Sequence, residues 1–577
     1  MRVRSIDEGA AGRLANALRV RSATARCLVA RGVTEPSAAQ GFIDPRLAAL
    51  RPPVELAGMT DAVTRLADAV VRGERIGVFG DYDVDGVTTA ALLTSFLRDS
   101  GAEVACAVAR RDAGYGFTTA AAADFAARGC AVVVTGDCGT NDLDAIYAGA
   151  ALGLEVIVVD HHTVPAAGTV HPALSLVNPF RPDSKFPFRG MASVGLMFYV
   201  AASVRTELRD RGWYRTRPEP DVRELLDLVA LGTIADLVPL SAENRILTSL
   251  GLRRLQARAR PGVAALLAAA GVGPDREVDA RTVAWKIAPR INAPGRLGAA
   301  EPALQLLLAT GAEAEQRAAQ LEGLNAERRA IQQRVLDEAL SIIEAKGGEA
   351  ALGPAIVLAG EGWPHGVVGI VAAKLVDKYA RPAFVIGVDP ETGTGRGSAR
   401  TVKGINLYDA LEEAAPWLDK FGGHAAAAGF TVRRENVAAI HDALGAAVGR
   451  VTKLADGSGP TRTAADADID AEVRLGEVDE RLAQELASLG PFGQDNPAPL
   501  LGARSLLVTS VRRVGDGAHL RLTLDDGTAI RSAIGFRLGD REVGVGARVD
   551  LAFVPTVSTW QGQRSAELEV ADLAVVS

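Results

Sequence analysis

Three short apolar runs alternate with helical patterns in the first third of the chain. The runs are IGVF (76–79), AVVV (131–134) and LEVIVV (154–159), and each is rich in branched residues. Apolar positions at helical spacing lie between them, at 88–97 and 119–127. Branched runs of this length are typical of strands buried on both faces, and strands that alternate with helices form parallel sheets. The pattern predicts an α/β domain built on a parallel sheet.

Helical patterns dominate the segments around this unit. We expect short helices over 1–47, a helix over 59–72, a buried helix over 224–240 that ends near Pro239, and the longest helix over 312–346. The longest one is rich in Ala, Glu, Gln, Arg and Leu, which are strong helix formers. We interpret it as a solvated connector between two domains.

A second strand-and-helix region begins at AIVLAG (355–360), and the pattern changes again after LADGSGPTRTAADAD (454–468). That Gly-, Ser- and Asp-rich segment is typical of a linker. Beyond it, short strands are separated by turn residues, and in HLRLTL (519–524) leucines alternate with polar residues. Such a series of half-buried strands predicts a small C-terminal β-barrel.

Composition and charge narrow the class of protein. The 577 residues are 48% hydrophobic and 23% charged, as in ordinary globular proteins. The net charge of −7 argues against a protein that coats nucleic acid through bulk charge, although a local basic groove stays compatible with it. The four cysteines form no CxxC pair, so neither a zinc ribbon nor a disulfide scaffold is expected. Without a signal-peptide core or a bilayer-length apolar stretch, we expect a cytoplasmic protein that does not enter a membrane.

Acidic and imidazole side chains follow the three apolar runs directly. The residues concerned are Asp81, Asp83 and Asp85 after the first run, Asp137 after the second, and Asp160, His161 and His162 after the third. In an open parallel sheet, ligands bind outside the carboxyl ends of the strands. A lone acid at a strand end is often a helix N-cap, and a DxDxDG loop without the downstream Glu does not make an EF-hand. Three acidic strand ends in succession predict one shared site.

Carboxylates packed this closely raise one another's pKa, and a divalent cation relieves the repulsion. Oxygen ligands with one or two imidazoles and no thiolate suit Mn²⁺ or Mg²⁺, and the imidazole favours Mn²⁺. Asp236 lies in the apolar segment GTIADLVPL, where a carboxylate is costly unless it is paired or ligates a metal. Two cations about 3.5–4 Å apart stabilise the attacking and leaving oxygens of a phosphoryl displacement. The sequence therefore predicts a site for two divalent cations that acts on a phosphate ester.

These motifs together resemble the DHH phosphoesterase superfamily and, within it, the bacterial exonucleases specific for single-stranded DNA. The matching segments are GDYDVDGVTT (80–89), TGDCGT (135–140), DHH (160–162), LGTIADLVPL (231–240), PRINAPGRLG (289–298), GEGWPHGVVGIVAAKL (360–375), GRGSAR (395–400), FGGHAAAAGF (421–430) and GPFGQDNPAP (490–499). The resemblance covers nearly the whole chain and implies six segments. They are an N-terminal helical extension (1–47), a DHH catalytic domain (48–300), connecting helices (301–347), a second α/β domain of DHHA1 type (348–453), a linker (454–468) and an OB-fold nucleic-acid-binding domain (469–577).

The resemblance also implies roles for individual residues. It makes Asp81, Asp83, Asp137, His161 and Asp236 the metal ligands. It makes Asp160 the group that orients an imidazole, and it makes His162 a phosphate-facing catalytic group. Asp85 is left between stabilising the turn and binding a metal through water. WPHGVVGI departs from the family pattern in the order of Pro364 and His365, so no role is assigned to His365.

Phosphodiester cleavage also needs groups that neutralise the phosphate and hold the chain. Arg suits this task because its planar fork reaches two phosphate oxygens. Two segments rich in small residues, GRGSAR and GGHAAAAG, read as loops that let a backbone approach an anion. The expected phosphate and nucleic-acid contacts are Arg110, Arg111, Tyr115, Arg290, Arg296, Arg400 and His424. Arg296 is also counted among the catalytic residues, and Tyr115 is a residue on which a base could stack.

The resemblance implies a metal-dependent 5′→3′ exonuclease that releases mononucleotides from single-stranded DNA in recombination and repair. It implies a monomer whose partners include single-stranded-DNA-binding protein and a RecQ-type helicase. Two alternatives remain. One is a DHH phosphodiesterase for short oligoribonucleotides or cyclic dinucleotides, and the other is a catalytically silent relative that only binds single strands. A long labelled strand digested beside a dinucleotide separates the first, and DNA binding without cleavage in Mn²⁺ identifies the second.

Overall fold

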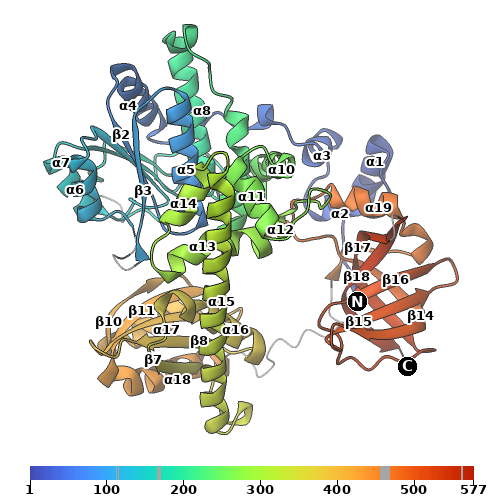
Figure 1. Cartoon of the computed structure of the whole chain (residues 1–577). Coiled ribbons are helices and arrows are strands. Elements are labelled where there is room, and N and C mark those ends of the chain that lie inside the picture. The colour runs from blue at the N-terminus through green and yellow to red at the C-terminus, as the bar shows by residue number, and fades with distance from the viewer. Residues whose placement is uncertain (112–113, 115, 166–169, 455–467, 561–562, 577) are drawn as a thin grey trace.

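The computed structural model describes residues 1–577 except 112–113, 115, 166–169, 455–467, 561–562 and 577. Two α/β units lie one above the other in Figure 1, and the helix α15 (Glu313–Ala345) runs along both of them. A C-terminal β-barrel lies to one side. The predicted fold class, with two α/β domains, a long helix between them and an all-β barrel, is confirmed. The linker expected at 454–468 falls almost entirely outside the described residues.

The first α/β unit is built on a parallel sheet of order β3-β2-β4-β5-β6. Its strands are β2 (Ile76–Gly80), β3 (Val104–Val108), β4 (Val132–Gly136), β5 (Glu155–Val159) and β6 (Ser175–Val177). The three predicted strands occupy the centre, whereas β3 and β6 were not expected. These outer strands are less uniformly apolar or very short, so their local pattern is weak.

Helices cover both faces of this sheet. They are α4 (Met59–Arg72), α5 (Val84–Asp99), α6 (Thr119–Ala127), α7 (Leu143–Ala151), α8 (Ser193–Asp210) and α9 (Leu226–Ala235). Ile76 and Val78 pack with α4, α5 and α8, while Phe79 packs with α6 and α7, because successive strand side chains point to opposite faces. Gly77 has no side chain, and the ring of Phe125 fills the space that a Cβ would occupy.

The helix expected to end near Pro239 ends earlier, at Ala235. Asp236 is its C-terminal cap, and Leu237 has a φ of 58°, a left-handed conformation that turns the chain away from the helix axis. The unit then continues with α10 (Ala242–Ala257), α11 (Pro261–Ala269), α12 (Ala280–Thr282), the π-helical turn η6 (Val283–Ile287), α13 (Ala288–Leu297) and α14 (Glu301–Leu308).

The second α/β unit has a mixed sheet of order β10-β11-β9-β8-β7. Its strands are β7 (Ile356–Glu361), β8 (Ala383–Val388), β9 (Thr394–Arg400), β10 (Leu418–Gly423) and β11 (Ala427–Arg433). The helices α15 and α16 (His365–Tyr379) cover one face, and α17 (Leu407–Glu413) and α18 (Val437–Leu454) cover the other.

The interpretation of GRGSAR and GGHAAAAG as loops is wrong, except for the turn at 424–426. The first lies in β9, and the second lies in β10 and β11 with the turn between them. Small residues are needed here because neighbouring groups come very close. A Cβ on Gly397 would lie 2.1 Å from the ring of Phe430 on the paired strand.

The C-terminal barrel consists of β14 (Leu501–Val514), β15 (His519–Asp525), β16 (Ile530–Gly535), β17 (Arg548–Trp560) and β18 (Gln563–Val576). β14 pairs with both β15 and β17, so the sheet closes on itself. Leu520, Leu522 and Leu524 are buried, and the residues between them are partly exposed. The predicted alternation of this strand is therefore confirmed.

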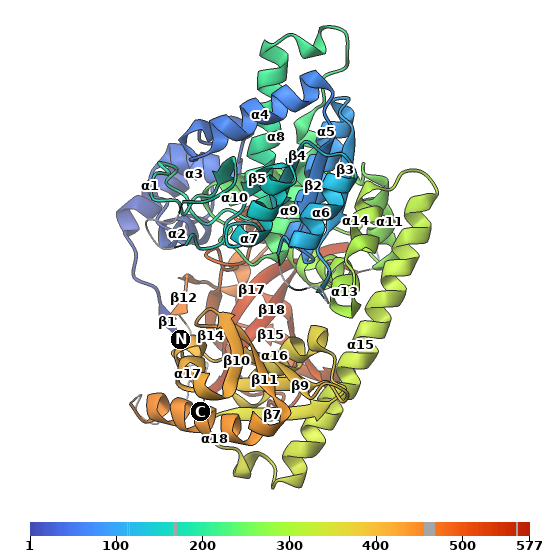
Figure 2. The same cartoon turned by 90° about the vertical axis from the view of Figure 1, so that its left-hand side faces the viewer.

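The N-terminal helices complete the barrel's core. They are α1 (Glu8–Leu18), α2 (Ser22–Ala30) and α3 (Pro36–Ile43). Leu14 and Leu28 are buried in the same cluster as Leu501, and Figure 1 shows α1 and α2 next to α19 (Glu480–Ala487) of the C-terminal unit. The short strand β1 (Arg2–Val3) pairs with β12 (Asp468–Ile469). The two ends of the sequence thus form one unit, whose barrel strands lie behind the second α/β unit in Figure 2. Among the described residues, no helix is both long and apolar enough to cross a bilayer.

Candidate active site

Carboxylates from neighbouring strand ends meet at the carboxyl edge of the parallel sheet. Asp81 and Asp83 follow β2, and Asp137 follows β4. Asp83 caps α5, because its Oδ1 accepts a hydrogen bond from the Gly86 amide at 3.1 Å. Asp137 has a φ of 64°, which is unusual for a residue with a side chain. This strained conformation at a strand end is of the kind that proteins retain at functional sites.

The ligand atoms of these side chains form three compact groups, each within 4.8 Å. The groups are Asp137 with His161 and His162; Asp85 with His161 and Asp236; and Asp81 with Asp83 and Asp137. Asp137 belongs to two of them. The five residues expected to ligate metal are therefore brought together, from two strand ends, the DHH turn and the end of α9.

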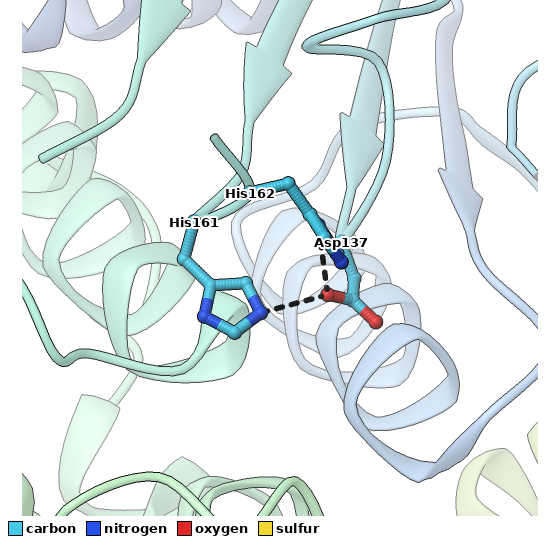
Figure 3. Close-up of side chains that lie close together, drawn as sticks. All are labelled: Asp137, His161 and His162. Carbon is cyan, nitrogen blue, oxygen red and sulfur yellow. Dashed lines mark ion pairs between the residues drawn. The ribbon is translucent and has the colours of Figure 1, made fainter. Parts of the chain in front are cut away.

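Both imidazoles face the same carboxylate, as Figure 3 shows. His161 Nε2 lies 3.4 Å from Asp137 Oδ1 and 3.5 Å from Asp236 Oδ2. His162 Nδ1 lies 4.0 Å from Asp137 Oδ1. Asp137 is thus the point at which the imidazoles and the β2 carboxylates meet.

Asp160 holds this turn in place. Its Oδ1 lies 2.7 Å from Nδ1 of His162 and also accepts the backbone amides of His161 and His162 at 2.7 and 3.1 Å. Its Oδ2 accepts the amide of Thr140 at 3.2 Å. Burial alone would raise the pKa of Asp160, but the hydrogen bond and charge of His162 outweigh it and the pKa is lowered. The Asp160 carboxylate therefore fixes the orientation of the His162 ring.

The clustered carboxyls resist ionisation when no cation is present. Burial and the charge of Asp83 raise the pKa of Asp81 to about 8 and that of Asp85 to about 7. Burial and the neighbouring carboxylates raise the pKa of Asp236 to about 9, and they place the pKa of Asp137 well above its ordinary value. Burial and the charge of His162 lower the pKa of His161 to about 4, which keeps this imidazole neutral.

The donor set fits divalent cations. Asp81 Oδ1 and Asp236 Oδ2 are buried and accept no hydrogen bond from the described residues, so each has a lone pair that a cation could use. Oxygen donors with a neutral imidazole are the ligands that Mn²⁺ and Mg²⁺ take. No thiol belongs to the three groups, and the nearby Cys138 donates its S–H to the oxygen of Gly136. The cluster can therefore hold the predicted cations.

Asp85 connects two helices beside the cluster, whereas its role was left open by the sequence. Its two oxygens accept the amides of Ser193 and Val194 at 2.7 and 3.0 Å, at the N-terminus of α8. The hydroxyl of Ser193 donates to Asp137 Oδ1 at 3.2 Å. Asp85 thus ties α5 to α8 and places Ser193 against the cluster, while its own oxygens also lie within reach of a cation.

Basic side chains form the opposite side of the site. Arg111 donates to the oxygen of Gly295 at 2.8 Å, and its guanidinium lies 4.0 Å from the ring centre of Tyr82. Arg296, at the end of α13, donates to the oxygen of Gly366 at 3.1 Å. Burial, then the charges of Arg111, Arg328 and Arg400, lower the pKa of Arg296 to about 10. Several guanidiniums of both α/β units therefore lie close enough to repel, an arrangement that an anion would stabilise.

The other predicted contacts have different surroundings. Arg400 ends β9 and donates to Ser398 Oγ at 3.2 Å. Arg110 forms a β-bridge with Ala299. Arg290 points to α15, where it pairs with Glu322. His424 is exposed in the turn between β10 and β11. Tyr115 lies outside the described residues.

Three residues of the site were not expected from the sequence. Asn178 follows β6 and donates to Thr140 Oγ1 at 3.1 Å and to the oxygen of His162 at 2.8 Å. It obeys the same strand-end rule as the acids, and it was missed because β6 is only three residues long. Ser193 carries no local signal, since only the packing of α8 brings its hydroxyl to Asp137. Tyr82 lies between Asp81 and Asp83 in the sequence, but only packing decides that Arg111 lies over its ring.

The three domain types are recognisable by comparison with known families. Residues 75–233 match the model of the DHH family, N-terminal domain, residues 352–450 match the DHHA1 domain, and residues 469–572 match the RecJ OB domain. The fold and site thus define a DHH-family protein with a DHHA1 domain and an oligonucleotide-binding barrel.

Full-length relatives narrow this class further. The single-stranded-DNA-specific exonuclease RecJ of Bacillus subtilis (strain 168) is 34% identical over 99% of this chain and 70% of its own length. RecJ of Escherichia coli (strain K12) is 34% identical over 90% of both chains. A crystal structure of RecJ in complex with Mn²⁺ from Thermus thermophilus superposes with a TM-score of 0.82, at 30% identity, over 100% of this chain and 79% of that chain. The chain belongs to the RecJ family, as the resemblance of its motifs predicted.

Proposed function

We propose that this chain is a metal-dependent exonuclease that hydrolyses single-stranded DNA from the 5′ end to mononucleotides, in recombination and repair. The observation that carries the proposal is the meeting of Asp137 with both imidazoles and the β2 carboxylates, opposite the guanidiniums of Arg111 and Arg296. Acids that hold cations and arginines that hold phosphate are the two requirements of phosphodiester hydrolysis. The relatives at 34% identity carry the name of this activity.

The cofactors we propose are two divalent cations, Mn²⁺ or Mg²⁺. RecJ structures from Thermus thermophilus are complexes with each of these ions. Asp81, Asp83, Asp137, His161 and Asp236 would hold them. When bound, such cations neutralise the phosphate and activate water for attack.

The remaining residues position the substrate. Asp160 accepts Nδ1–H of His162, so the opposite ring nitrogen, Nε2, is the one that would contact a phosphate oxygen. Arg296 and Arg111 lie on the DHH side, and Arg400 lies on the DHHA1 side. A phosphate between the two domains would therefore receive donors from both, which holds the scissile bond in line for attack.

Membership of the RecJ family also suggests how the substrate is held and which partners the chain has. The barrel matches a RecJ OB domain, and we propose that it holds the part of the strand on the 3′ side of the cleaved nucleotide. By family resemblance, we propose single-stranded-DNA-binding protein and a RecQ-type helicase as partners, and the cytoplasm as the location. We further propose that the chain works as a monomer.

Digestion of labelled DNA tests the proposal. In Mn²⁺, the protein should degrade a single strand to mononucleotides and leave a blunt duplex and an RNA strand of the same sequence largely intact. Asp137→Ala should remove cleavage while single-strand binding persists, because Asp137 serves the metal site and the arginines serve binding. Near-normal cleavage by this variant would show that the metal site lies elsewhere.

Two other results would replace the proposal. Preference for a dinucleotide over the long strand would make the chain a phosphodiesterase of short oligonucleotides. Tight single-strand binding without cleavage in either Mn²⁺ or Mg²⁺ would make it a binding protein with the fold of the enzyme.

A further inference from the structure

One continuous helical segment connects the barrel to the junction of the two α/β units beside the acidic cluster. It comprises α12, η6 and α13, over residues 280–297. Near its start, Arg281 Nη1 pairs with Glu569 Oε1 of strand β18 at 2.7 Å. Near its end, Arg296 donates to the oxygen of Gly366 at the junction of the DHH and DHHA1 domains. Figure 1 shows α12 beside the barrel and α13 above the DHHA1 sheet. A strand that passes from the barrel to the cleft would run along this segment.

The segment has two distinct faces. Val283, Ile287 and Ile291 recur every four residues and are buried, with at most 1% of their surface exposed. The opposite face carries Arg281 and Trp285, which are exposed, and Pro289, Asn292 and Arg296, which are half-buried, at spacings of three and four residues. Positions at this spacing lie on one side of a helix. This face therefore runs from the barrel contact, where it is exposed, to Arg296 at the junction of the two α/β units, where it is half-buried.

Trp285 lies in the middle of this face and is 76% exposed. Among the residues that the structure describes, its ring has no stacking partner and its indole N–H has no acceptor. Other tryptophans are used internally: Trp363 is 4% exposed and donates to Glu338, and Trp213 donates to the oxygen of Ser100. Trp285 is also part of a π-helical turn, a local irregularity that is frequent at functional sites.

The charge of the segment suits a nucleic acid. Residues 281–296 include Arg281, Lys286, Arg290 and Arg296 and contain no acidic residue, in a chain whose net charge is −7. Lys286 is exposed next to Trp285. An exposed aromatic ring among cations is the combination by which proteins bind single strands without regard to sequence, because every base has a face that can stack.

We infer that Trp285 is a stacking platform for one base of the single strand, on its path between the barrel and the cleft. The inference rests on the proposed function. Trp285 and Arg296 are eleven positions apart in the sequence, about 16 Å along a helix axis. The stacked base therefore belongs to a nucleotide on the 3′ side of the one being cleaved, and a dinucleotide held at Arg296 is too short to reach the ring.

Binding of defined DNA strands tests the inference. The probe is a labelled single strand of about 20 nucleotides, longer than one OB fold covers, in EDTA so that cleavage does not interfere. Trp285→Ala should weaken binding about tenfold, and Trp285→Phe should restore most of it. Trp417→Ala is the matched control, because Trp417 is also accessible, at 37%, but lies in the DHHA1 domain, and it should bind as the wild type does.

A strand with one missing base locates the contact. Moving an abasic site along the probe should reveal one position at which the wild-type protein loses affinity and Trp285→Ala does not. Cleavage of a dinucleotide in Mn²⁺ should be equal for the two proteins. Unchanged affinity of Trp285→Ala, equal loss in Trp285→Phe, or an abasic profile shared by both proteins would overturn the inference. Absence of cleavage by the wild type would instead contradict the proposed function. The binding measurements would still decide whether Trp285 contacts the strand.

Discussion

Arg296 donates a hydrogen bond to the oxygen of Gly366 at 3.1 Å, and this contact joins the DHH domain to the DHHA1 domain. The two residues lie at the end of α13 and the start of α16. A Cβ on Gly366 would lie only 2.0 Å from the backbone oxygen of Arg296. The absence of a side chain at Gly366 therefore sets how closely the two domains approach, and it places Arg296 at their junction.

The first prediction concerns this junction. Gly366→Ala should push α16 away from α13, because backbone oxygen cannot yield to a methyl group at that distance. We expect kcat/KM on single-stranded DNA to fall at least tenfold, about 1.4 kcal/mol of transition-state stabilisation. Gly323→Ala is the control, because Gly323 lies in α15 with open space around it and Ala favours a helix. Equal activity of the two variants would contradict the prediction.

The second prediction concerns the phosphate contact of Arg296. Arg296→Ala should weaken single-strand binding and reduce the slope of log K against log salt concentration by about one, because one phosphate contact is lost. Binding measured at several salt concentrations gives the slope. Arg223→Ala removes a charge of the same kind from an exposed pair with Asp221 and should leave the slope unchanged. A slope shared by Arg296→Ala and the wild type would exclude a direct phosphate contact.

The third prediction concerns the support of His162 by Asp160. Asp160→Asn keeps the shape of the side chain but removes the negative charge of the carboxylate. That carboxylate orients the imidazole of His162, and its Oδ1 accepts the amides of the turn. We expect a loss of about 10–100-fold in activity or in Mn²⁺ affinity, as for other groups that orient metal-site residues. Steady-state cleavage at several Mn²⁺ concentrations separates the two effects. Asp144→Asn, at an exposed position, is the control, and if both variants matched the wild type the orienting role would be refuted.

The fourth prediction concerns metal binding without catalysis. A cation that binds only the folded state stabilises it by mass action, about 2.7 kcal/mol at a concentration one hundred times Kd. Mn²⁺ should therefore raise the Tm of the wild-type protein by several degrees, and EDTA should reverse the rise. Asp236→Asn should show a much smaller rise, because it removes one of the buried ligand oxygens. An equal rise in this variant would place the cations away from Asp236.

The fifth prediction concerns the unit formed by the two ends of the chain. Leu28 is completely buried in the core that α2 shares with the barrel. Leu28→Ala should cost about 2–5 kcal/mol and should expose sites in β14–β18 to limited proteolysis. Leu66→Ala, equally buried in the DHH core, should instead expose sites in the DHH domain. Protection of the barrel in Leu28→Ala would show that it is stable without the N-terminal helices.

Local sequence was sufficient for the elements whose pattern is strong. Strands β2, β4 and β5 and helices α4, α6 and α15 follow from apolar runs and helical spacing, because their burial repeats with the period of the element itself. The clustering of Asp81, Asp137 and His161 was also predictable, since parallel strands bring their carboxyl ends to one edge.

Tertiary structure alone decided the contacts between distant segments. Pairing of β1 with β12, the hydrogen bond of Ser193 to Asp137 and the approach of Gly366 to Arg296 join residues with no shared local pattern. GRGSAR likewise resembles a loop in isolation but is a strand, because it pairs with both β8 and β11, and Phe430 fills the space above Gly397. Residue type and spacing determined which groups could do chemistry, and packing determined which of them meet. A contact between distant segments depends on the shapes of both surfaces, so neither segment predicts it alone.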